Sequence, residues 1–252
     1  TNVQDALDSS AFVAGDTVMV VGSSTLYGSI TIVLPVAIIG EGINNISGQN
    51  TKFDIINIHC SNVQISGVDV NQLTLDTWVG SDTISDVLIE RCKFNNGYSF
   101  VMNRRPNNSY HGLFKNIRII NNVFAGGGYF SLNDVDGPFN NSLVSYDSLI
   151  IENNIFSNYT FVRYLPQGNI LGLDKVIINH NNFIFGSTSV FYGAGQFMIP
   201  VTDAKITNNI FHTSNANDCS NCDFLNNLTF NNGINDTLTS TGIVSGNIIG
   251  DS

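Results

Sequence analysis

The chain has 252 residues with twenty acidic and ten basic side chains, a net charge of −10 and a pI near 4.5. Nucleic-acid binding relies on Lys and Arg to neutralise phosphates, so this composition argues against it. The longest apolar stretch, Ile30–Ile39, is interrupted by Thr31 and Pro35 and is too short for membrane insertion. Hydrophobic residues make up 42% of the chain, which is enough for a packed core.

The chain begins with a segment in which Val3, Ala6 and Leu7 have helical spacing, which predicts an amphipathic helix within residues 1–11. Three strand-like segments follow, at Gly15–Val21, Leu26–Ile32 and Val36–Gly42. The first coil of a solenoid exposes an apolar end, and a helix with a polar outer face is the usual cover. We therefore expect the helix to cap the first coil.

One pattern then recurs five times: an apolar V-x-I segment and, five residues after its last position, a phenylalanine. The copies are Val87–Phe94, Ile117–Phe124, Leu149–Phe156, Val176–Phe183 and Ala204–Phe211, with weaker ones at Asn62–Val70 and Val244–Ile249. The phenylalanines are 30, 32, 27 and 28 residues apart. A constant core with connections of variable length is typical of the stacked coils of a solenoid.

An asparagine precedes most of these phenylalanines by two residues. The position holds Asn122, Asn154, Asn181, Asn209 and, in the last copy, Asn247, with Val68 and Cys92 in the earliest copies. The chain must turn here, and asparagine tolerates the left-handed backbone conformation better than other non-glycine residues, so we expect that conformation at these positions. Stacking would align the amides into an asparagine ladder that satisfies the buried backbone groups of neighbouring turns.

The order of a helix, a G-D-T-V strand, a Y-G-S-I-T-I strand and an I-I-G-E-G turn, followed by the N-N-x-F coils, resembles the pectate-lyase-like superfamily. The resemblance implies an all-β fold, a single-stranded right-handed parallel β-helix over residues 1–252 with three strands per coil. It implies no single function, because the superfamily includes lyases, hydrolases, phage tailspikes and non-catalytic surface proteins. Residues 243–250 form a last coil with no cap after it, so we expect further domains of the same chain.

A third strand must follow each phenylalanine if every coil has three. We predict it at Tyr98–Met102, Tyr129–Leu132, Phe161–Tyr164 and Ser189–Tyr192, with long loops after it at Asn103–Lys115, Asn133–Asp147, Leu165–Asp174 and Gly193–Ala204. Solenoids place binding surfaces beside such loops, and the family's substrate cleft runs along this strand. Alternation predicts inward-pointing side chains at Phe100, Phe130, Val162 and Val190, and an outward row of Val101, Ser131, Arg163 and Phe191.

Arg163 is the one charged residue in these four strand cores. In the lyases that the chain resembles, an arginine on this face acts as the base and nearby acidic residues hold Ca²⁺ against a uronate. The resemblance therefore makes Arg163 a catalytic candidate, and it makes Asp134 and Asp136 candidate ligands of Ca²⁺. The alternative is that Arg163 is a solvated or salt-bridged surface residue, and the chain then requires no cofactor.

Several other side chains near this row suit a carbohydrate. The candidate binding residues are Arg104, Arg105, Tyr110, Tyr129, Asn133 and Phe191. The arginine pair could bind a carboxylate or sulfate, although a solvated loop tip is the simpler interpretation, and the aromatic rings could stack on sugars. A glycosidase needs two facing carboxylates, and these loops contain only the Asp134/Asp136 cluster, so hydrolysis is not expected.

The four cysteines do not indicate a disulfide scaffold. Cys219 and Cys222 form a C-x-x-C in a polar loop with no second such pair. A zinc site would need two more ligands, and His212 is the one near candidate. We expect a local disulfide or free thiols.

Together these observations favour a secreted or cell-surface domain that binds a polysaccharide or a cell-surface partner and has no chemistry of its own. The negative charge and the few ionisable residues along the predicted cleft support this hypothesis. A polysaccharide lyase acting on uronate-containing glycans with Ca²⁺ is the first alternative. A rigid structural fibre, as in phage tailspikes, is the second.

Overall fold

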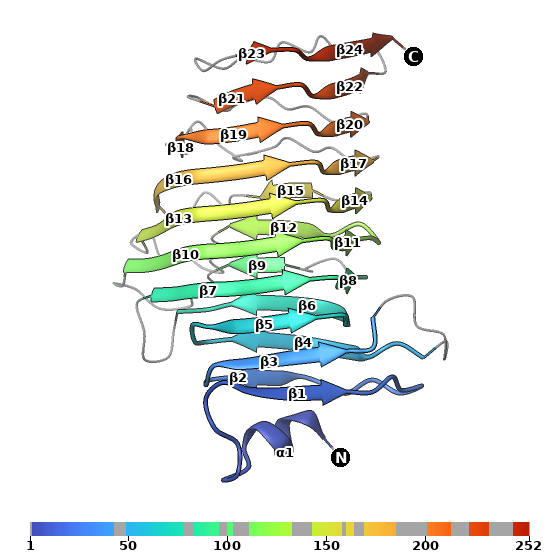
Figure 1. Ribbon diagram of the computed structural model, residues 1–252, viewed down its shortest axis with the longest axis vertical. Coiled ribbons are helices and arrows are strands. Elements are labelled where there is room, and N and C mark those ends of the chain that lie inside the picture. The colour runs from blue at the N-terminus through green and yellow to red at the C-terminus, as the bar shows by residue number, and fades with distance from the viewer. Residues whose placement is uncertain are drawn as a thin grey trace.

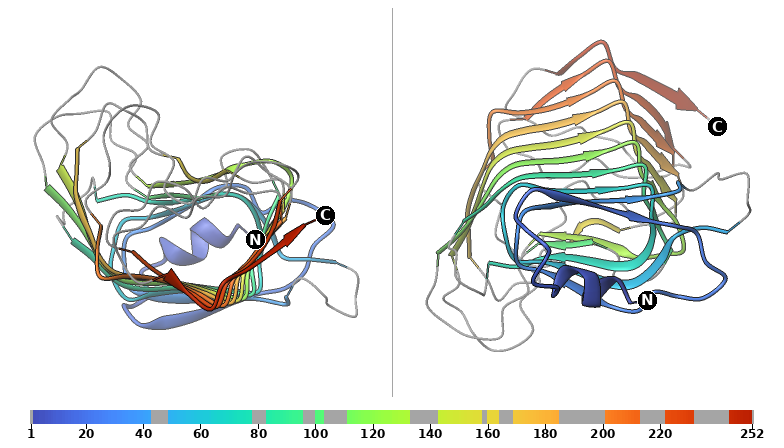
Figure 2. Two further views of the ribbon diagram at one scale, coloured as in Figure 1. Left: turned by 90° about the horizontal axis from the view of Figure 1, so that it is seen from above. Right: turned by 60° about the horizontal axis from the view of Figure 1, so that its bottom comes forward.

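The computed structural model of the protein describes residues 2–42, 49–77, 83–95, 100–102, 111–132, 143–157, 160–163, 169–184, 201–212, 222–231 and 244–251. These residues form two long parallel sheets and one short helix (Figure 1). The strands follow one another up the stack in sequence order, and successive coils lie above one another (Figure 2). The predicted all-β class and the parallel, solenoid-like architecture agree with this arrangement.

The first sheet has eleven strands and contains the V-x-I segments. Its order is β1 (Asp16–Val20), β3 (Val36–Gly40), β5 (Val63–Ser66), β7 (Thr83–Glu90), β10 (His111–Ile120), β13 (Leu143–Glu152), β16 (Asn169–Asn179), β19 (Ala204–Thr207), β21 (Cys222–Leu225) and β23 (Val244–Ser245), with β18 (Val201–Thr202) beside β16. Equivalent residues of the repeat pair in register, for example Ile119 with Ile151. The repeat found in the sequence is therefore the repeat of the sheet.

The second sheet has thirteen strands and contains the x-F segments. They are β2 (Ile30–Ile32), β4 (Lys52–Ile58), β6 (Asp69–Leu75), β8 (Lys93–Phe94), β11 (Val123–Phe124), β14 (Ile155–Ser157), β17 (Asn182–Ile184), β20 (Ile210–His212), β22 (Leu228–Asn231) and β24 (Ile248–Asp251), together with β9 (Phe100–Met102), β12 (Tyr129–Leu132) and β15 (Thr160–Arg163). Strand β6 pairs with β8 at its start and with β9 at its end. Strands β9, β12 and β15 therefore follow the x-F strands where the sequence predicts them.

The helix α1 (Val3–Leu7) lies at the N-terminal end of the stack (Figure 1). Asn2 caps it by accepting a hydrogen bond from the Gln4 amide. The side chain of Gln4 accepts from the backbone N–H of Thr31 at 2.7 Å, and Val3 is buried against the first coil. The helix is shorter than the predicted segment 1–11, because the polar run Asp8–Ser10 favours turns over helix.

The interior consists of stacked columns of like side chains. Five phenylalanines of the second sheet stack nearly parallel, with centroid distances between successive rings of 4.4 to 5.0 Å: Phe94, Phe124, Phe156, Phe183 and Phe211. Phe100 and Phe130 stack in the next column at 4.7 Å, and both are fully buried as predicted. Contacts of this kind add to the hydrophobic stabilisation of each ring.

The turn asparagines form one hydrogen-bonded column, which we call the asparagine column: Asn122, Asn154, Asn181, Asn209, Asn227 and Asn247. Each side-chain oxygen accepts from the backbone N–H one coil earlier; the Asn122 N–H, for example, donates to Asn154 Oδ1 at 2.8 Å. Each side-chain N–H₂ donates to a strand carbonyl, as Asn154 does to Ile119 at 2.8 Å. Asn227 lies outside the predicted column, because it belongs to a coil of β21 and β22 with shorter spacing.

The prediction that these asparagines have left-handed backbone is wrong. The positive φ lies one residue earlier, at Gly67, Arg91, Asn121, Asn153, His180, Asn208, Asn226 and Gly246. The turn requires one left-handed residue and, next to it, one residue whose side chain enters the stack, and these are separate positions. The second asparagine of each N-N pair therefore makes the buried hydrogen bonds and the first makes the bend.

A second left-handed corner, not foreseen from the sequence, precedes each V-x-I segment. It occurs at Asn62, Asp86, Asn116, Ser148, Lys175 and Asp203. Pairing continues across it, so β10, β13 and β16 begin at His111, Leu143 and Asn169, and β18 begins at Val201. The ends of the four predicted long loops are thus strand, and Phe114 stacks on Tyr146 within them at 5.3 Å.

Candidate functional site

The strand row predicted to carry Arg163 is present in the backbone. Ser131 of β12 pairs with Val101 of β9 on one side and with Arg163 of β15 on the other. A shift of register between Phe130 and Ser131 makes Phe161, and not Val162, the partner of Phe130. Simple alternation could not reveal this irregularity, because it assumes one residue opposite one.

Val101, a member of this outward row, is only 1% exposed, so the row is covered at this position. The polar side chains of Thr74 and Asp76 on the neighbouring β6 segment are also buried. The predicted outward direction of Val101 therefore does not make this side chain accessible to solvent. Alternation determines the direction of a side chain, but what packs against the sheet determines whether it meets solvent.

Most of the predicted binding residues lie outside the described part of the chain. These are Arg104, Arg105, Tyr110, Asn133, Asp134, Asp136 and Phe191, and with them Cys219. Tyr129 and Arg163 are placed in β12 and β15 by their backbone. The proposed Ca²⁺ ligands and the catalytic arginine therefore remain predictions.

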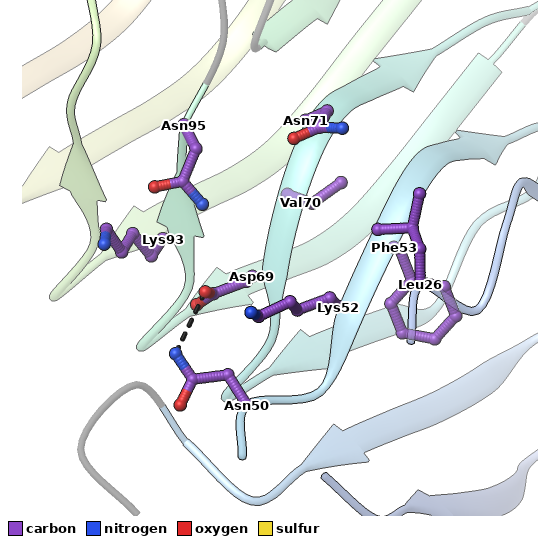
Figure 3. A pocket seen from close by; sticks show the side chains of 9 residues that line it. All are labelled: Leu26, Asn50, Lys52, Phe53, Asp69, Val70, Asn71, Lys93 and Asn95. Carbon is purple, nitrogen blue, oxygen red and sulfur yellow. Dashed lines mark hydrogen bonds between the residues drawn. The ribbon is translucent and has the colours of Figure 1, made fainter. Parts of the chain in front are cut away.

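A polar pocket that includes none of the predicted site residues lies on the outward side of the second sheet, between its early strands. It has a volume of about 310 Å³. We call it the Asp69 pocket, and its lining residues are Leu26, Asn50, Lys52, Phe53, Asp69, Val70, Asn71, Lys93 and Asn95 (Figure 3). Most come from β4, β6, β8 and the segments just before or after them, so the regular strands hold the pocket in place.

Asp69 is the central charged group of this pocket. It is 5% exposed, although its side chain points outward in the same row as two lysines. One carboxylate oxygen accepts from the Asn50 side-chain amide at 3.0 Å (Figure 3). The other, Oδ1, is shielded and has no hydrogen-bond donor. A buried carboxylate oxygen without a donor is costly, so this residue stands out among the polar groups of the described chain.

Two lysines flank Asp69 in register. Lys52 of β4 pairs with it on one side and Lys93 of β8 on the other. Lys52 is exposed, Lys93 is half-buried, and neither takes part in the ion pairs of the described residues, which join Arg91 to Glu90 and Lys175 to two aspartates. Figure 3 shows the ammonium end of Lys93 extending away from Asp69. Both cations are therefore available to a ligand.

The amides of the pocket are oriented by carboxylates. Asn50 donates its N–H₂ to Asp69, and Asn71 donates its own to Asp54 at 3.0 Å. Each side-chain oxygen can then accept a hydrogen bond from a ligand. Acceptors, an exposed Leu26 and two ammonium groups within one small pocket suit a hydroxylated ligand with an anionic group.

A signal for this site was present in the sequence. The position before the recurring phenylalanine is Lys93 in one copy and Val123, Ile155, Asn182 and Ile210 in later copies. In the structure Lys52 and Asp69 fall in the same row. A run of charged residues in a row that is otherwise mostly apolar would have indicated the site, once the early coils were aligned.

The described thiols do not provide a nucleophile. Burial raises the pKa of Cys60 to about 11 and that of the fully buried Cys92 to about 12, so both stay protonated at neutral pH. Burial also lowers the pKa of His59, and the charge of Asp76 partly opposes this effect. The two thiols therefore pack as protonated side chains, and burial favours the neutral form of His59.

No family model, curated protein or solved structure matches the chain. Among the described residues, His, Cys, Asp and Glu side chains form no group of three or more that could hold a metal ion. The single described helix, of five residues, is not a candidate membrane span. The Asp69 pocket is the site that the described residues support best.

Proposed function

We propose that this chain is a secreted or cell-surface β-helix domain that binds carbohydrate and has no chemistry of its own. In this proposal the coils wind right-handed, as parallel strand crossovers almost always do, with three strands each and a ladder of stacked asparagines, as in the pectate-lyase-like superfamily. A polysaccharide, or the glycan of a surface partner, is the ligand.

The observation that carries the proposal is the Asp69 pocket. Its volume of about 310 Å³ is close to the lower end of the range for small-molecule sites, which suits one or two sugar rings. Its oriented amides and the donor-free carboxylate oxygen of Asp69 favour a ligand with several hydroxyl groups. It sits on paired strands, which favours binding without rearrangement.

A glycan array probed with the purified protein tests the proposal. We expect retention of a defined set of glycans, and loss of that retention in Asp69→Asn, which keeps the size of the side chain but removes its charge. Asp203→Asn is the matched control, because Asp203 is exposed at a corner of the first sheet, where asparagine also tolerates the left-handed backbone. Failure of the unmodified protein to retain any glycan would contradict the proposal.

A polysaccharide lyase remains the second candidate, and the pairing of Ser131 with Arg163 is the observation in its favour. The test is incubation with uronate polysaccharides and Ca²⁺ while the absorbance of the unsaturated product is followed. Product formation that Arg163→Ala abolishes, and Asp69→Asn leaves intact, would replace the binding proposal with the lyase. For the structural fibre, a trimer in sedimentation analysis would be the supporting result.

A further inference from the structure

We infer that the Asp69 pocket takes a sugar unit bearing a sulfate or phosphate ester, and that Lys52 and Lys93 hold the ester together. This inference rests on the proposed function and names the ligand class for the same pocket. It starts from the row Lys52–Asp69–Lys93, three charged residues at neighbouring register positions of β4, β6 and β8.

The geometry allows both lysines to reach one group. Neighbouring strands are about 4.8 Å apart, so the backbones of Lys52 and Lys93 are separated by about 9.6 Å. An extended lysine side chain spans roughly 6 Å and has a compact, freely rotating ammonium group. The two ammonium groups can therefore converge above Asp69, on a group larger than a single atom.

The charge balance favours an anion. Among the lining residues, two lysines and one carboxylate leave one positive charge in excess, on a chain with a net charge of −10; Asp54, which accepts from Asn71, lies outside this lining. An anionic ligand is repelled by the chain as a whole and attracted at this position, which directs it here. Among the described residues, neither the exposed Lys52 nor the half-buried Lys93 has an ion-pair partner that a ligand would displace.

The type of cation in the pocket limits which class of anion fits it. The cations of the pocket are lysines, and its lining residues include no arginine, whose planar fork binds a carboxylate or a phosphate through two parallel hydrogen bonds. Lysines act as point charges and suit the three terminal oxygens of a tetrahedral ester, which accept from several directions. The amide oxygens of Asn50 and Asn71 then receive the hydroxyl groups of the ring, and Leu26 faces its C–H groups.

Three polymers with the same backbone provide the test: dextran, carboxymethyl dextran and dextran sulfate, immobilised and probed with the protein at low and high salt. We expect dextran sulfate to be bound about tenfold or more tightly than the other two. Lys52→Gln/Lys93→Gln should lose that preference, whereas Lys205→Gln, which removes one exposed charge from the first sheet, should keep it. Competition by glucose 6-sulfate against glucose 6-phosphate then shows which ester is preferred.

Equal binding of the three polymers would overturn the inference, and so would a preference for dextran sulfate that survives in the double lysine variant. In either case binding to a glycan array that depends on Asp69 would leave the proposed function standing. Absence of all glycan binding, including on the array, would defeat both. Because the protein is strongly acidic, non-specific attraction to a polyanion does not imitate the expected result.

Discussion

The outward row of the second sheet differs between the early and the late coils. In the early coils it consists of Lys52, Asp69 and Lys93, and in the late coils of Val123, Ile155, Asn182, Ile210, Leu228 and Ile248. The inner corner changes at the same place, from Val68 and Cys92 to the asparagine column. The same backbone thus carries a varied half, with the pocket, and a uniform half that repeats one set of contacts.

This difference indicates a division of roles. The late coils gain stability from identical neighbours above and below, because ring stacking and amide hydrogen bonds between coils form where like residues stand in successive coils. In the described residues the coils of β4 and β6 contribute neither to the phenylalanine stack nor to the asparagine column, so side chains there can differ from coil to coil without disrupting either. Four changes, taken from the largest expected effect to the smallest, test this comparison.

The phenylalanine stack should be the strongest element of the late coils. Phe156→Ala removes a fully buried ring between two stacked neighbours, and we expect a loss of about 4 kcal/mol in the free energy of unfolding. Val70→Ala, in the equivalent inward position of the early coils, should cost about 2 kcal/mol. Urea denaturation measures both. Equal losses would mean that the two halves do not differ in this column.

The asparagine column should contribute nearly as much to the free energy of unfolding as the phenylalanine stack. Asn181→Ala leaves the N–H of Asn154 without its acceptor and removes the amide hydrogen bond to the carbonyl of Ile151, so we expect a loss of about 3 kcal/mol. Cys92→Ala removes a weaker sulfur contact at the same position in an early coil and should cost about 1 kcal/mol. Thermal unfolding followed by circular dichroism compares the two. A larger effect at Cys92 would refute the assigned role of the column.

Extending the asparagine column by one coil should remove part of the difference in stability between the early and the late coils. In the structure Cys92 Sγ lies 3.7 Å from the carbonyl of Ile65, the acceptor that an asparagine amide would reach there. We therefore expect Cys92→Asn to raise the free energy of unfolding by about 1 kcal/mol, whereas Cys92→Leu, which cannot hydrogen-bond, should lower it. Chemical denaturation of the three proteins is the measurement. A destabilised Cys92→Asn would show that the early corner cannot accept an amide.

The outward row of the late coils should tolerate change. Ile210 is 39% exposed, and Ile210→Thr keeps β-branching, so we expect a change within about 0.5 kcal/mol and unaltered glycan binding. Denaturation and the glycan array provide the two measurements. A loss of binding here would place the ligand surface along the whole row and not in the Asp69 pocket alone.

Much of the repeat could be predicted from the sequence. Spacing and alternation, which depend on local geometry, predict the V-x-I and x-F segments and the inward Phe100 and Phe130. They also predict the positions of strands β9, β12 and β15. The sequence pattern places the left-handed residue of each N-N pair one position too late, because asparagine suits both the bend and the asparagine column. Asn227 was missed because its coil is only 18 residues from the previous asparagine.

The candidate site could not be found in the same way. Lys52 is 17 residues from Asp69, and Asp69 is 24 from Lys93, and no motif links them. Their neighbourhood exists because β4, β6 and β8 pair in register. The burial of Val101 likewise depends on what covers the sheet, which periodicity does not contain.

The sequence by itself determined the period, the inward columns and, to within one residue, the turn before each x-F strand, because these depend on side chains within one coil. Only the tertiary structure decided which charged residues meet, where the coils bend a second time and which outward side chains are covered. Those properties depend on the register between coils, and a register is a relation between segments that the sequence separates.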